Sequence, residues 1–314
     1  MGDDATDPNL LAFASNVTPT LHRTTYPAIS PSRPELSQVG NTILITGGSA
    51  GIGLATAKSF ITASASTIVI TGRRPEILSN AIASLTEAAK TSGKGTRIIG
   101  KQSDGSNPDA INTLWDELAK DGVVVDVLVL NIAKFATPKP LLELGIDHVW
   151  ESFNVNVRAP LHFAERFSQQ GAGRPKTILN LSTNAVHMYN YLPFLRGRPE
   201  YSLSKGSGTL ALQYIAADVS PDEIQIISYH PGVIYTEAWS GQGATEDMFP
   251  FDDITMPADF AVWAASKEAR FLHGRFVWAA WDVEELAKGE VRKRIDNEVD
   301  FLTMNIWGLK GANV

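Results

Sequence analysis

The sequence predicts an α/β protein built on a doubly wound parallel sheet of seven strands. Short apolar, β-branched segments alternate with helical segments along most of the chain, which is the pattern of right-handed βαβ crossovers. A glycine-rich turn joins the first predicted strand to the first helix. Segment 123–130 is almost continuously apolar, as expected for a strand buried on both faces of a sheet. We therefore expect one domain rather than two in this chain of 314 residues.

The predicted elements alternate from residue 42 onward. Strands are expected at 42–46, 67–71, 96–100, 123–130, 177–181, 224–229 and 275–279. Helices are expected at 52–60, 75–90, 108–120, 146–169, 201–219 and 258–269. The second of these helices begins with Pro75, a position where the missing N–H costs no hydrogen bond. Together the elements predict a single α/β domain over residues 41–281.

The two flanks of this domain differ from it in pattern. Five prolines interrupt residues 1–40, and no helical or strand period survives there, so we expect an N-terminal arm. It could pack on the domain or on a partner subunit, or remain a partly ordered tail. Residues 282–314 are predicted to form a polar, helical C-terminal tail.

Composition excludes several classes of function. Lys and Arg number 27 against 34 Asp and Glu, a net charge of −7, which argues against nucleic acid as the main partner. The absence of cysteine excludes disulfides, thiolate metal sites and cysteine nucleophiles, and fits a reducing, cytoplasmic location. No apolar run is long enough to span a membrane, and residues 1–10 do not resemble a secretory signal. The histidines lack ligand spacing, so we expect no metal.

The glycine-rich turn predicts a site for a dinucleotide. Glycines allow a tight turn and a close approach to a pyrophosphate, while the following helix N-terminus offers N–H groups and partial positive charge. The position of this turn between a strand and a helix strengthens the interpretation, although a tight turn without a ligand is the alternative. The residues expected to contact the cofactor here are Thr46, Gly47, Ser49, Gly51, Ile52 and Gly53.

The end of the second strand indicates which dinucleotide is bound. An acidic residue about 20 positions beyond the glycines would accept a hydrogen bond from a ribose 2′-hydroxyl. The chain instead has Arg73 and Arg74, whose guanidinium groups suit a 2′-phosphate, so the sequence favours NADP over NAD. A solvated arginine pair is the alternative. Asp104 could accept from the adenine amino group, or could simply stabilise a turn.

Tyr201 and Lys205 stand four residues apart in a predicted helix, so both side chains face the same way. A neighbouring ammonium favours the phenolate and is expected to lower the pKa of the phenol. Such a tyrosine could exchange a proton with a substrate oxygen near neutral pH. The spacing alone is weak, because it also arises by chance.

The glycine turn and the Tyr201-x-x-x-Lys205 spacing together resemble the short-chain dehydrogenase/reductase family, which has a Rossmann fold. The resemblance covers roughly residues 40–280, and the long N-terminal arm is similar to fungal members. It implies that Asn131, Ala133, Pro231, Gly232, Val233 and Thr236 also contact the cofactor. It also implies that Asn156 and a hydroxyl at Ser182 or Thr183 join the catalytic group, with Thr183 ranked first by its place in the motif.

The chain departs from the family pattern in two places. Ala133 stands where the family has glycine, so the local backbone beside the cofactor could differ. Thr183 stands where the family has its catalytic serine, and the spacing from there to Tyr201 is longer than usual, which predicts an extra loop on the substrate side.

The resemblance implies an NADPH-dependent oxidoreductase acting on CH–OH or C=O groups. Thr183 and Tyr201 would bind the substrate oxygen, Tyr201 would transfer the proton, Lys205 would bind the nicotinamide ribose, and Asn156 would hold a proton-relaying water. Aromatic residues suggest an apolar or aromatic metabolite, although they could instead close the core or a subunit contact, and a ketoreductase of secondary metabolism is expected. These residues are Tyr189, Tyr191, Phe194, Trp239, Phe249 and Phe251, with Met248 beside them.

Other readings of the same sequence remain open. The enzyme could oxidise an alcohol rather than reduce a ketone, because cofactor ratios help to set direction. The chain could be a non-catalytic NADP-binding sensor or scaffold, or could catalyse a redox-neutral isomerisation or cyclisation. The family resemblance also implies a small-molecule substrate and a homodimer or homotetramer.

Overall fold

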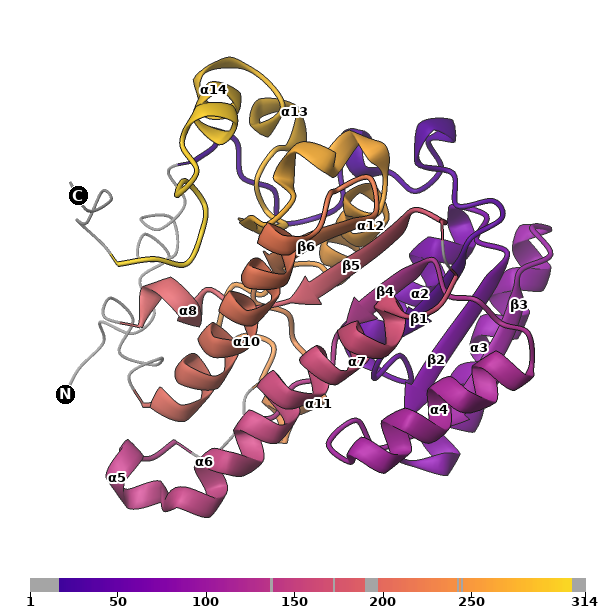
Figure 1. Ribbon diagram of the computed structural model, residues 1–314, viewed down its shortest axis with the longest axis horizontal. Coiled ribbons are helices and arrows are strands. Elements are labelled where there is room, and N and C mark those ends of the chain that lie inside the picture. Colours follow the sequence, from indigo (N-terminus) through magenta and orange to yellow (C-terminus); the bar gives the residue numbers. More distant parts are fainter. Residues whose placement is uncertain are drawn as a thin grey trace.

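A computed structural model describes residues 17–135, 138–171, 173–189, 197–241, 243 and 245–306 of the chain. At its centre lies a seven-stranded sheet in which every neighbouring pair of strands is parallel (Figure 1). The strands are β1 (Thr42–Ile45), β2 (Thr67–Gly72), β3 (Arg97–Gln102), β4 (Val127–Leu130), β5 (Lys176–Leu181), β6 (Ile224–His230) and β7 (Phe276–Trp278). The doubly wound sheet predicted from the sequence is confirmed.

The strand order β3-β2-β1-β4-β5-β6-β7 places the reversal of winding between β1 and β4. Ile43 pairs with Ile68 of β2 on one side and with Val127 of β4 on the other. In open α/β sheets the crevice at such a reversal, beyond the carboxyl ends of the strands, is where ligands bind. The topology therefore directs attention to the loops that follow β1 and β4.

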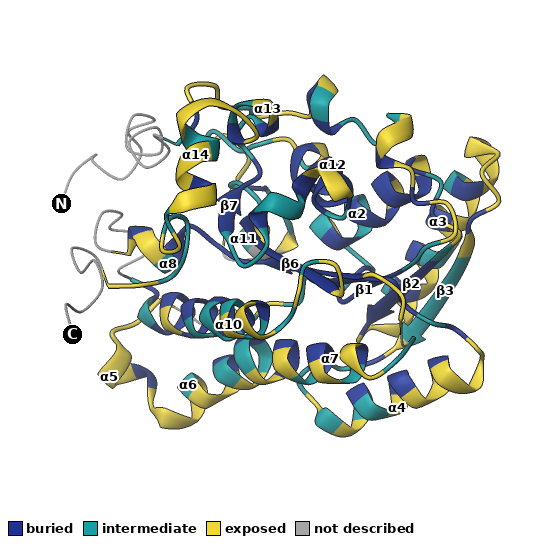
Figure 2. Cartoon of the chain, turned by 45° about the horizontal axis from the view of Figure 1, so that its top comes forward, coloured by how far each residue is buried: buried dark blue, intermediate teal, exposed yellow. Residues whose placement is uncertain are grey.

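Helices cover both faces of the sheet (Figure 2). One face packs against α2 (Gly51–Thr62), α3 (Pro75–Ser92) and α12 (Thr255–Ala264). The other packs against α4 (Pro108–Lys120), α7 (Ala159–Ser168) and α10 (Pro199–Asp218). Shorter helices and turns include α5 (Leu141–Leu144), α6 (Ile146–Phe153), α8 (Ala185–Met188), α11 (Glu237–Ser240) and η5 (Lys267–Leu272). Each face of the sheet thus has its own apolar core, as a doubly wound fold requires.

The fourth strand is shorter than the sequence predicts. Only Val127–Leu130 pairs with neighbouring strands, whereas Val123 and Val125 are buried in the approach to it. An apolar run indicates which residues are buried but not which ones pair with a neighbouring strand. The predicted strand therefore began too early, at residue 123. Asp126 interrupts the run: its carboxylate accepts from the Thr42 N–H and pairs with Arg174.

The helix expected at 146–169 is divided into α6, a π-helical turn η4 (Asn154–Arg158) and α7. In a continuous α-helix the N–H of residue 160 would donate to the carbonyl of Asn156, but Pro160 has no N–H. The hydrogen bonding widens instead, and the Ala159 N–H reaches the Asn154 carbonyl. Turns of this kind are frequent at functional sites.

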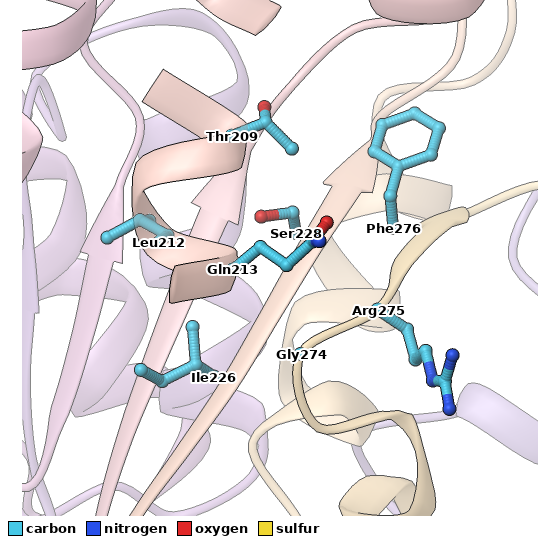
Figure 3. Close-up of a pocket in the computed structure, with 8 residues that line it drawn as sticks. All are labelled: Thr209, Leu212, Gln213, Ile226, Ser228, Gly274, Arg275 and Phe276. Atoms are coloured by element: carbon cyan, nitrogen blue, oxygen red, sulfur yellow. The ribbon is translucent and has the colours of Figure 1, made fainter. Parts of the chain in front are cut away.

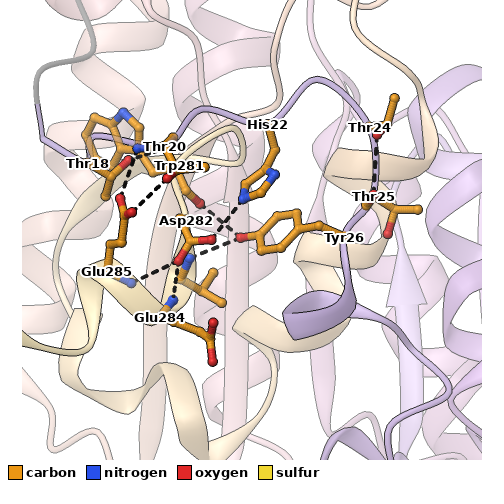
Figure 4. A network of polar contacts seen from close by, with 11 residues as sticks. Thr18, Thr20, His22, Thr24, Thr25, Tyr26, Trp281, Asp282, Glu284 and Glu285 are labelled. Atoms are coloured by element: carbon orange, nitrogen blue, oxygen red, sulfur yellow. Dashed lines mark hydrogen bonds and ion pairs between the residues drawn. The ribbon is translucent and has the colours of Figure 1, made fainter.

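The described part of the N-terminal arm packs on the domain. It contains two short 3₁₀ turns, η2 (Pro27–Ile29) and η3 (Pro34–Leu36), and buries Ile29 and Leu36 fully. An antiparallel bridge joins Leu21 to Trp281, and the Tyr26 hydroxyl donates to the Trp281 carbonyl (Figure 4). This part of the arm therefore lies against the chain that follows β7.

The described part of the C-terminal tail holds two helices, α13 (Val283–Leu286) and α14 (Gly289–Asn297). Asp282 caps α13 by accepting from the N–H groups of Glu284 and Glu285, and its other oxygen meets His22 of the arm at 2.9 Å (Figure 4). Thr20 of the arm is hydrogen-bonded to Glu285 through both its N–H and its hydroxyl. The described parts of the arm and of the tail are thus joined by hydrogen bonds.

Helix α10 lies across β5 and β6 and carries small and polar residues on the face that it turns to the sheet. Thr209 and Leu212 approach Ser228 and Ile226 of β6 (Figure 3). The Gln213 side chain binds the backbone of Met304, so the tail runs along this helix. Within the described part of the chain, no helix has both the length and the apolar character needed to cross a lipid bilayer.

Candidate active site

The glycine turn follows β1 and leads into α2, as the sequence predicts. Gly47 and Gly51 have φ angles of +65° and +53°, conformations that other residues rarely adopt. A β-carbon placed on Gly53 would lie 2.5 Å from the Gly47 carbonyl oxygen, so only glycine fits there. Ala50 at the N-cap has no side chain that could accept from the first N–H groups of α2, which leaves them for an anion.

Asn131, which follows β4, fastens this turn to the centre of the sheet. Its side-chain amide donates to the carbonyls of Thr46 and Gly47 at 3.0 and 3.2 Å. The buried Thr46 hydroxyl in turn donates to the Val129 carbonyl and accepts from the Asn131 N–H. The next side chain, Ile132, packs over Gly47, and Ala133 is exposed beyond it. The predicted residues after β1 and β4 are thus brought together.

At the end of β2, Ser49 packs on Gly72, so the glycine turn touches the strand that precedes the two arginines. Arg74 is the N-cap residue of α3 and forms two hydrogen bonds of 2.7 Å with Glu237 of α11. Asp104 accepts from the N–H and the hydroxyl of Ser106, which is the turn role left open by the sequence.

The pKa of Asp104 is also influenced by the charge of Arg73. Burial raises the pKa of this carboxyl, but the hydrogen bonds from Ser106 and the positive charge of Arg73 outweigh that effect, so its pKa lies below the ordinary value. Both arginines expected to meet a 2′-phosphate are therefore near carboxylates of this chain.

Tyr201 and Lys205 lie on the first turns of α10, and both side chains are almost fully buried. Thr183 follows β5; its hydroxyl accepts from the Ala185 N–H and acts to lower the pKa of the Tyr201 phenol. Lys205 Nζ donates to the Leu181 carbonyl at the end of the same strand. The end of β5 thus positions a hydroxyl and a carbonyl against the two residues of the helix.

Ser182 and Thr183 point to different partners. The Ser182 hydroxyl lies 2.6 Å from the Thr209 hydroxyl, in the buried contact between β5 and α10. The Thr183 hydroxyl instead lies with Asn184 and Ala185, where it acts to lower the pKa of Tyr201. This geometry favours Thr183 as the hydroxyl that acts with Tyr201, in line with the ranking made from the sequence.

The expected lowering of the Tyr201 pKa is wrong for this structure. Burial raises the pKa of the phenol above its usual range; the Thr183 hydrogen bond opposes the rise, and the neighbouring Glu200 carboxylate adds to it. Burial also lowers the pKa of Lys205 to about 8. The sequence argument considered only the attraction between ammonium and phenolate, whereas desolvation penalises both charged forms.

Asn156 lies in η4 and is tied to its surroundings by its side chain. The amide oxygen accepts from the Lys134 N–H at 2.9 Å, and the amide nitrogen donates to the Lys134 carbonyl and to the Ser204 hydroxyl. A β-carbon on Gly208 would lie 2.2 Å from the Asn156 carbonyl oxygen, so glycine lets α10 approach η4 closely. Asn156 therefore links the loop after β4 to the helix that carries Tyr201.

The segment after β6 returns towards the glycine turn. Two hydrogen bonds join Val233 and Asp252 across this segment: the Val233 N–H donates to the Asp252 carboxylate, and the Asp252 N–H donates to the Val233 carbonyl. Arg23 of the N-terminal arm binds the same carboxylate at 2.9 Å. Thr236 Cγ2 lies 3.6 Å from the place of a β-carbon on Gly51. Gly232, between Pro231 and Val233, has a φ of +97°.

The aromatic residues of this segment pack on one another. The Trp239 ring lies 5.4 Å from the Phe249 ring and 5.6 Å from the Phe251 ring, measured between centroids, and Tyr235 also contacts Phe251. Met248 is half exposed. Tyr191 and Phe194, which we expect at the substrate side, lie outside the described residues, and Tyr189 is at their edge.

Sequence reasoning missed residues whose importance depends on tertiary contacts. Phe135 stacks on Tyr201, Asp252 accepts from the Val233 N–H in the segment after β6, and Glu237 forms an ion pair with Arg74. None belongs to a motif, and each reaches a partner far along the chain. The position of Phe135, four residues beyond Asn131, was the one available signal. Among the described residues, no group of three or more His, Asp or Glu is placed to hold a metal ion.

Comparison with known proteins agrees with this geometry. A sequence model of the family described as short chain dehydrogenase matches residues 41–247. The short chain dehydrogenase/reductase AacuD of Aspergillus aculeatus is 34% identical over 289 residues, 92% of this chain and 96% of that protein. A short chain dehydrogenase/reductase of Claviceps purpurea is 34% identical over 308 residues, 98% of this chain and 99% of that protein. The chain belongs to the short-chain dehydrogenase/reductase family.

Solved structures share the fold. L-sorbose reductase from Gluconobacter frateurii, crystallised with NADPH and L-sorbose, superposes with a TM-score of 0.66 at 21% identity, covering 78% of this chain and 96% of that one. With the family established, the chain is an oxidoreductase of the short-chain dehydrogenase type.

Proposed function

We propose that this protein is an NADPH-dependent reductase of the carbonyl group of a small apolar or aromatic metabolite, with Tyr201 as proton donor. The observation that carries the proposal is the burial of the Tyr201 phenol beside Thr183, whose hydroxyl favours the phenolate, with Lys205 one helical turn away. The same residues would serve an alcohol dehydrogenase in the opposite direction, since proton transfer through Tyr201 is reversible.

The residues around the glycine turn fit a dinucleotide. The turn lacks room for a β-carbon at Gly53, and the N-terminus of α2 presents backbone N–H groups without a capping side chain. Both features suit the close approach of a pyrophosphate. Arg73 and Arg74 support NADP as the cofactor, because a guanidinium binds phosphate in a bidentate manner. When bound, the nicotinamide supplies the hydride.

The chain's own residues account for the other half of the reaction. The Thr183 hydroxyl accepts from the Ala185 N–H and donates to the Asn184 side chain at 3.4 Å, a long hydrogen bond that it would exchange for one to a substrate oxygen. Tyr201 donates to the same oxygen and releases its proton as negative charge develops there. Because burial keeps the pKa of Tyr201 high, the phenol is protonated at neutral pH and acts as the acid for reduction. Lys205 and Asn156 position the helix and the loop around it.

The proposed substrate is apolar or aromatic, and we propose that the reaction belongs to secondary metabolism. The aromatic group of Tyr235, Trp239, Phe249 and Phe251 supports this, as does the stacked ring of Phe135 beside Tyr201. We also propose a homodimer or homotetramer in the cytoplasm. Exposed apolar side chains on α6, α7 and α10 support the assembly, namely Ile146, Trp150, Leu161, Leu203 and Tyr214.

The test is an assay of reduced-nicotinamide absorbance with a panel of apolar and aromatic ketones, offered with NADPH and with NADH. We expect consumption with NADPH, and its loss by about 10²-fold or more in Tyr201→Phe, because general acid catalysis contributes that much. Nucleotide binding should survive this substitution. Normal turnover by Tyr201→Phe would sink the proposed role of the phenol.

A further inference from the structure

Arg74 and Glu237 form an ion pair between two segments that are far apart in sequence. Arg74 Nη1 and Nη2 each donate to one oxygen of the Glu237 carboxylate at 2.7 Å, so both terminal nitrogens are engaged. Arg74 is the second residue after β2, and Glu237 is the first residue of α11. Both side chains are more than half exposed, at 57% and 67%.

The ion pair lies beside the glycine turn. Thr236, the residue before Glu237, approaches the β-carbon position of Gly51 at the start of α2. On the other side, Gly72 of β2 touches Ser49 of the turn, and Arg74 follows Gly72 by two residues. The Glu237 carboxylate therefore stands where the end of β2 and the phosphate-binding turn meet, which is where the adenosine ribose of a dinucleotide lies in this type of fold.

We propose that Glu237 is a positioning residue that affects the choice of cofactor. Its carboxylate binds the Arg74 guanidinium and so competes with the cofactor's 2′-phosphate for the same side chain. This inference rests on the proposed NADP site. A carboxylate and a phosphate present the same pair of acceptor oxygens to a guanidinium. The phosphate carries about two negative charges and the carboxylate one, so the phosphate is the stronger partner.

The exposure of the ion pair makes such an exchange feasible. An ion pair held in water contributes little net stability, so Arg74 can leave Glu237 at small cost. A nucleotide without a 2′-phosphate has nothing to exchange with the carboxylate and leaves the ion pair intact. Glu237 therefore weakens the binding of NADPH and leaves the binding of NADH unchanged.

The experiment measures dissociation constants by calorimetry for four probes: NADPH, adenosine 2′,5′-bisphosphate, NADH and 5′-AMP. Glu237→Gln should bind the first two about two- to fivefold more tightly, the range set by an exposed ion pair. Binding of the last two should not change. Glu246→Gln, which removes a different exposed carboxylate from the same segment, is the matched control and should behave as the parent.

A second comparison shows whether Glu237 acts through Arg74. In an Arg74→Ala background the effect of Glu237→Gln should be largely lost; an undiminished effect would mean general repulsion of phosphate and overturn the inference. Unchanged or weaker NADPH binding by Glu237→Gln, in a protein whose parent binds NADPH, would overturn this inference alone. A parent that binds none of the four probes would overturn the proposed cofactor site and with it the role of Glu237.

Discussion

The ring of Phe135 lies parallel to the ring of Tyr201, with centroids 4.1 Å apart and an interplanar angle of 17°. One face of the phenol is therefore covered by an apolar side chain from the loop after β4. Phe135 is itself 38% exposed, so it stands between Tyr201 and the outside of the site. This stacking contributes to the burial that raises the pKa of Tyr201.

Replacing Phe135 by Ala should lower the pKa of Tyr201, because water then reaches the phenol and solvates the phenolate. A reductase that needs the protonated phenol loses activity above this pKa. We therefore expect the alkaline limb of the kcat/KM profile to move to lower pH in Phe135→Ala. Phe135→Tyr keeps the stacked ring and should retain the parent profile. If the alkaline limb of the Phe135→Ala profile stays at the pH of the parent, the stacking does not raise the pKa of Tyr201.

Thr183 and Ser182 can be separated by their partners. Thr183→Val removes the hydroxyl that meets Tyr201 while keeping the side-chain shape, and should reduce kcat by about 10²-fold, as loss of a donor to a developing oxyanion does. Thr183→Ser should restore most of the activity. Steady-state kinetics with NADPH and a ketone would measure both effects, and full activity in Thr183→Val would reject this role.

Ser182→Ala should affect stability more than catalysis. Its hydroxyl is buried against Thr209, so the substitution leaves a buried partner unsatisfied and should cost about 1 kcal/mol of unfolding free energy. Urea denaturation would measure the loss, with kcat nearly unchanged. A large fall in kcat without a change in stability would move the catalytic hydroxyl from Thr183 to Ser182.

The double substitution Arg73→Ala with Arg74→Ala should weaken NADPH far more than NADH. Hydrogen bonds to charged groups are worth about 1.5–3 kcal/mol, so the dissociation constant for NADPH should rise by about 10²-fold. Fluorescence titration with both cofactors would measure the ratio. Equal losses for the two cofactors would contradict a 2′-phosphate site at the end of β2.

The contact between His22 and Asp282 predicts that the stability added by the docked N-terminal arm depends on pH. Burial raises the pKa of Asp282, but hydrogen bonds from His22 and from the N–H groups of Glu285 and Glu284 outweigh it, so the native pKa lies below 3.8. A carboxyl with a lowered native pKa stabilises the fold fully above its unfolded pKa, and this contribution is lost as pH falls through the native value.

The free energy of unfolding of Asp282→Asn should therefore be lower than that of the parent by about 1 kcal/mol near pH 6. This is the size expected for a partly buried hydrogen bond to a charged group. The difference should shrink as pH falls below 3.8 and vanish only below the native pKa of Asp282, which is lower still. Chemical denaturation of both proteins at a series of pH values would follow it. A difference that persists unchanged into strong acid would mean that the amide substitution acts through packing and not through charge.

Much of the fold could be predicted from local pattern. The glycine turn between β1 and α2, and the strands that pair around it, were visible because βαβ units have short, regular connections. The break of the long helix at Asn154–Arg158 was not predicted, although Pro160 was the signal for it. Its effect on the Asn156 carbonyl depends on hydrogen-bond register, which an apolar pattern does not report.

The candidate site divides in the same way. Thr183, Tyr201 and Lys205 could be singled out from spacing and family resemblance, and the structure brings them together at the end of β5. The direction of the Tyr201 pKa could not, because it depends on how much water reaches the phenol. Burial by Phe135 and by the walls of the site is a property of packing, not of spacing along the helix.

By itself, the sequence determined the α/β alternation, the glycine turn, the two arginines after β2 and the tyrosine and lysine of α10, because each is a local pattern of spacing and residue type. Only the tertiary structure decided that Glu237 occupies Arg74, that Ser182 turns to Thr209, and that the arm is held by Asp282. These contacts join residues from distant parts of the chain, and they form only once the strands have taken their order in the sheet.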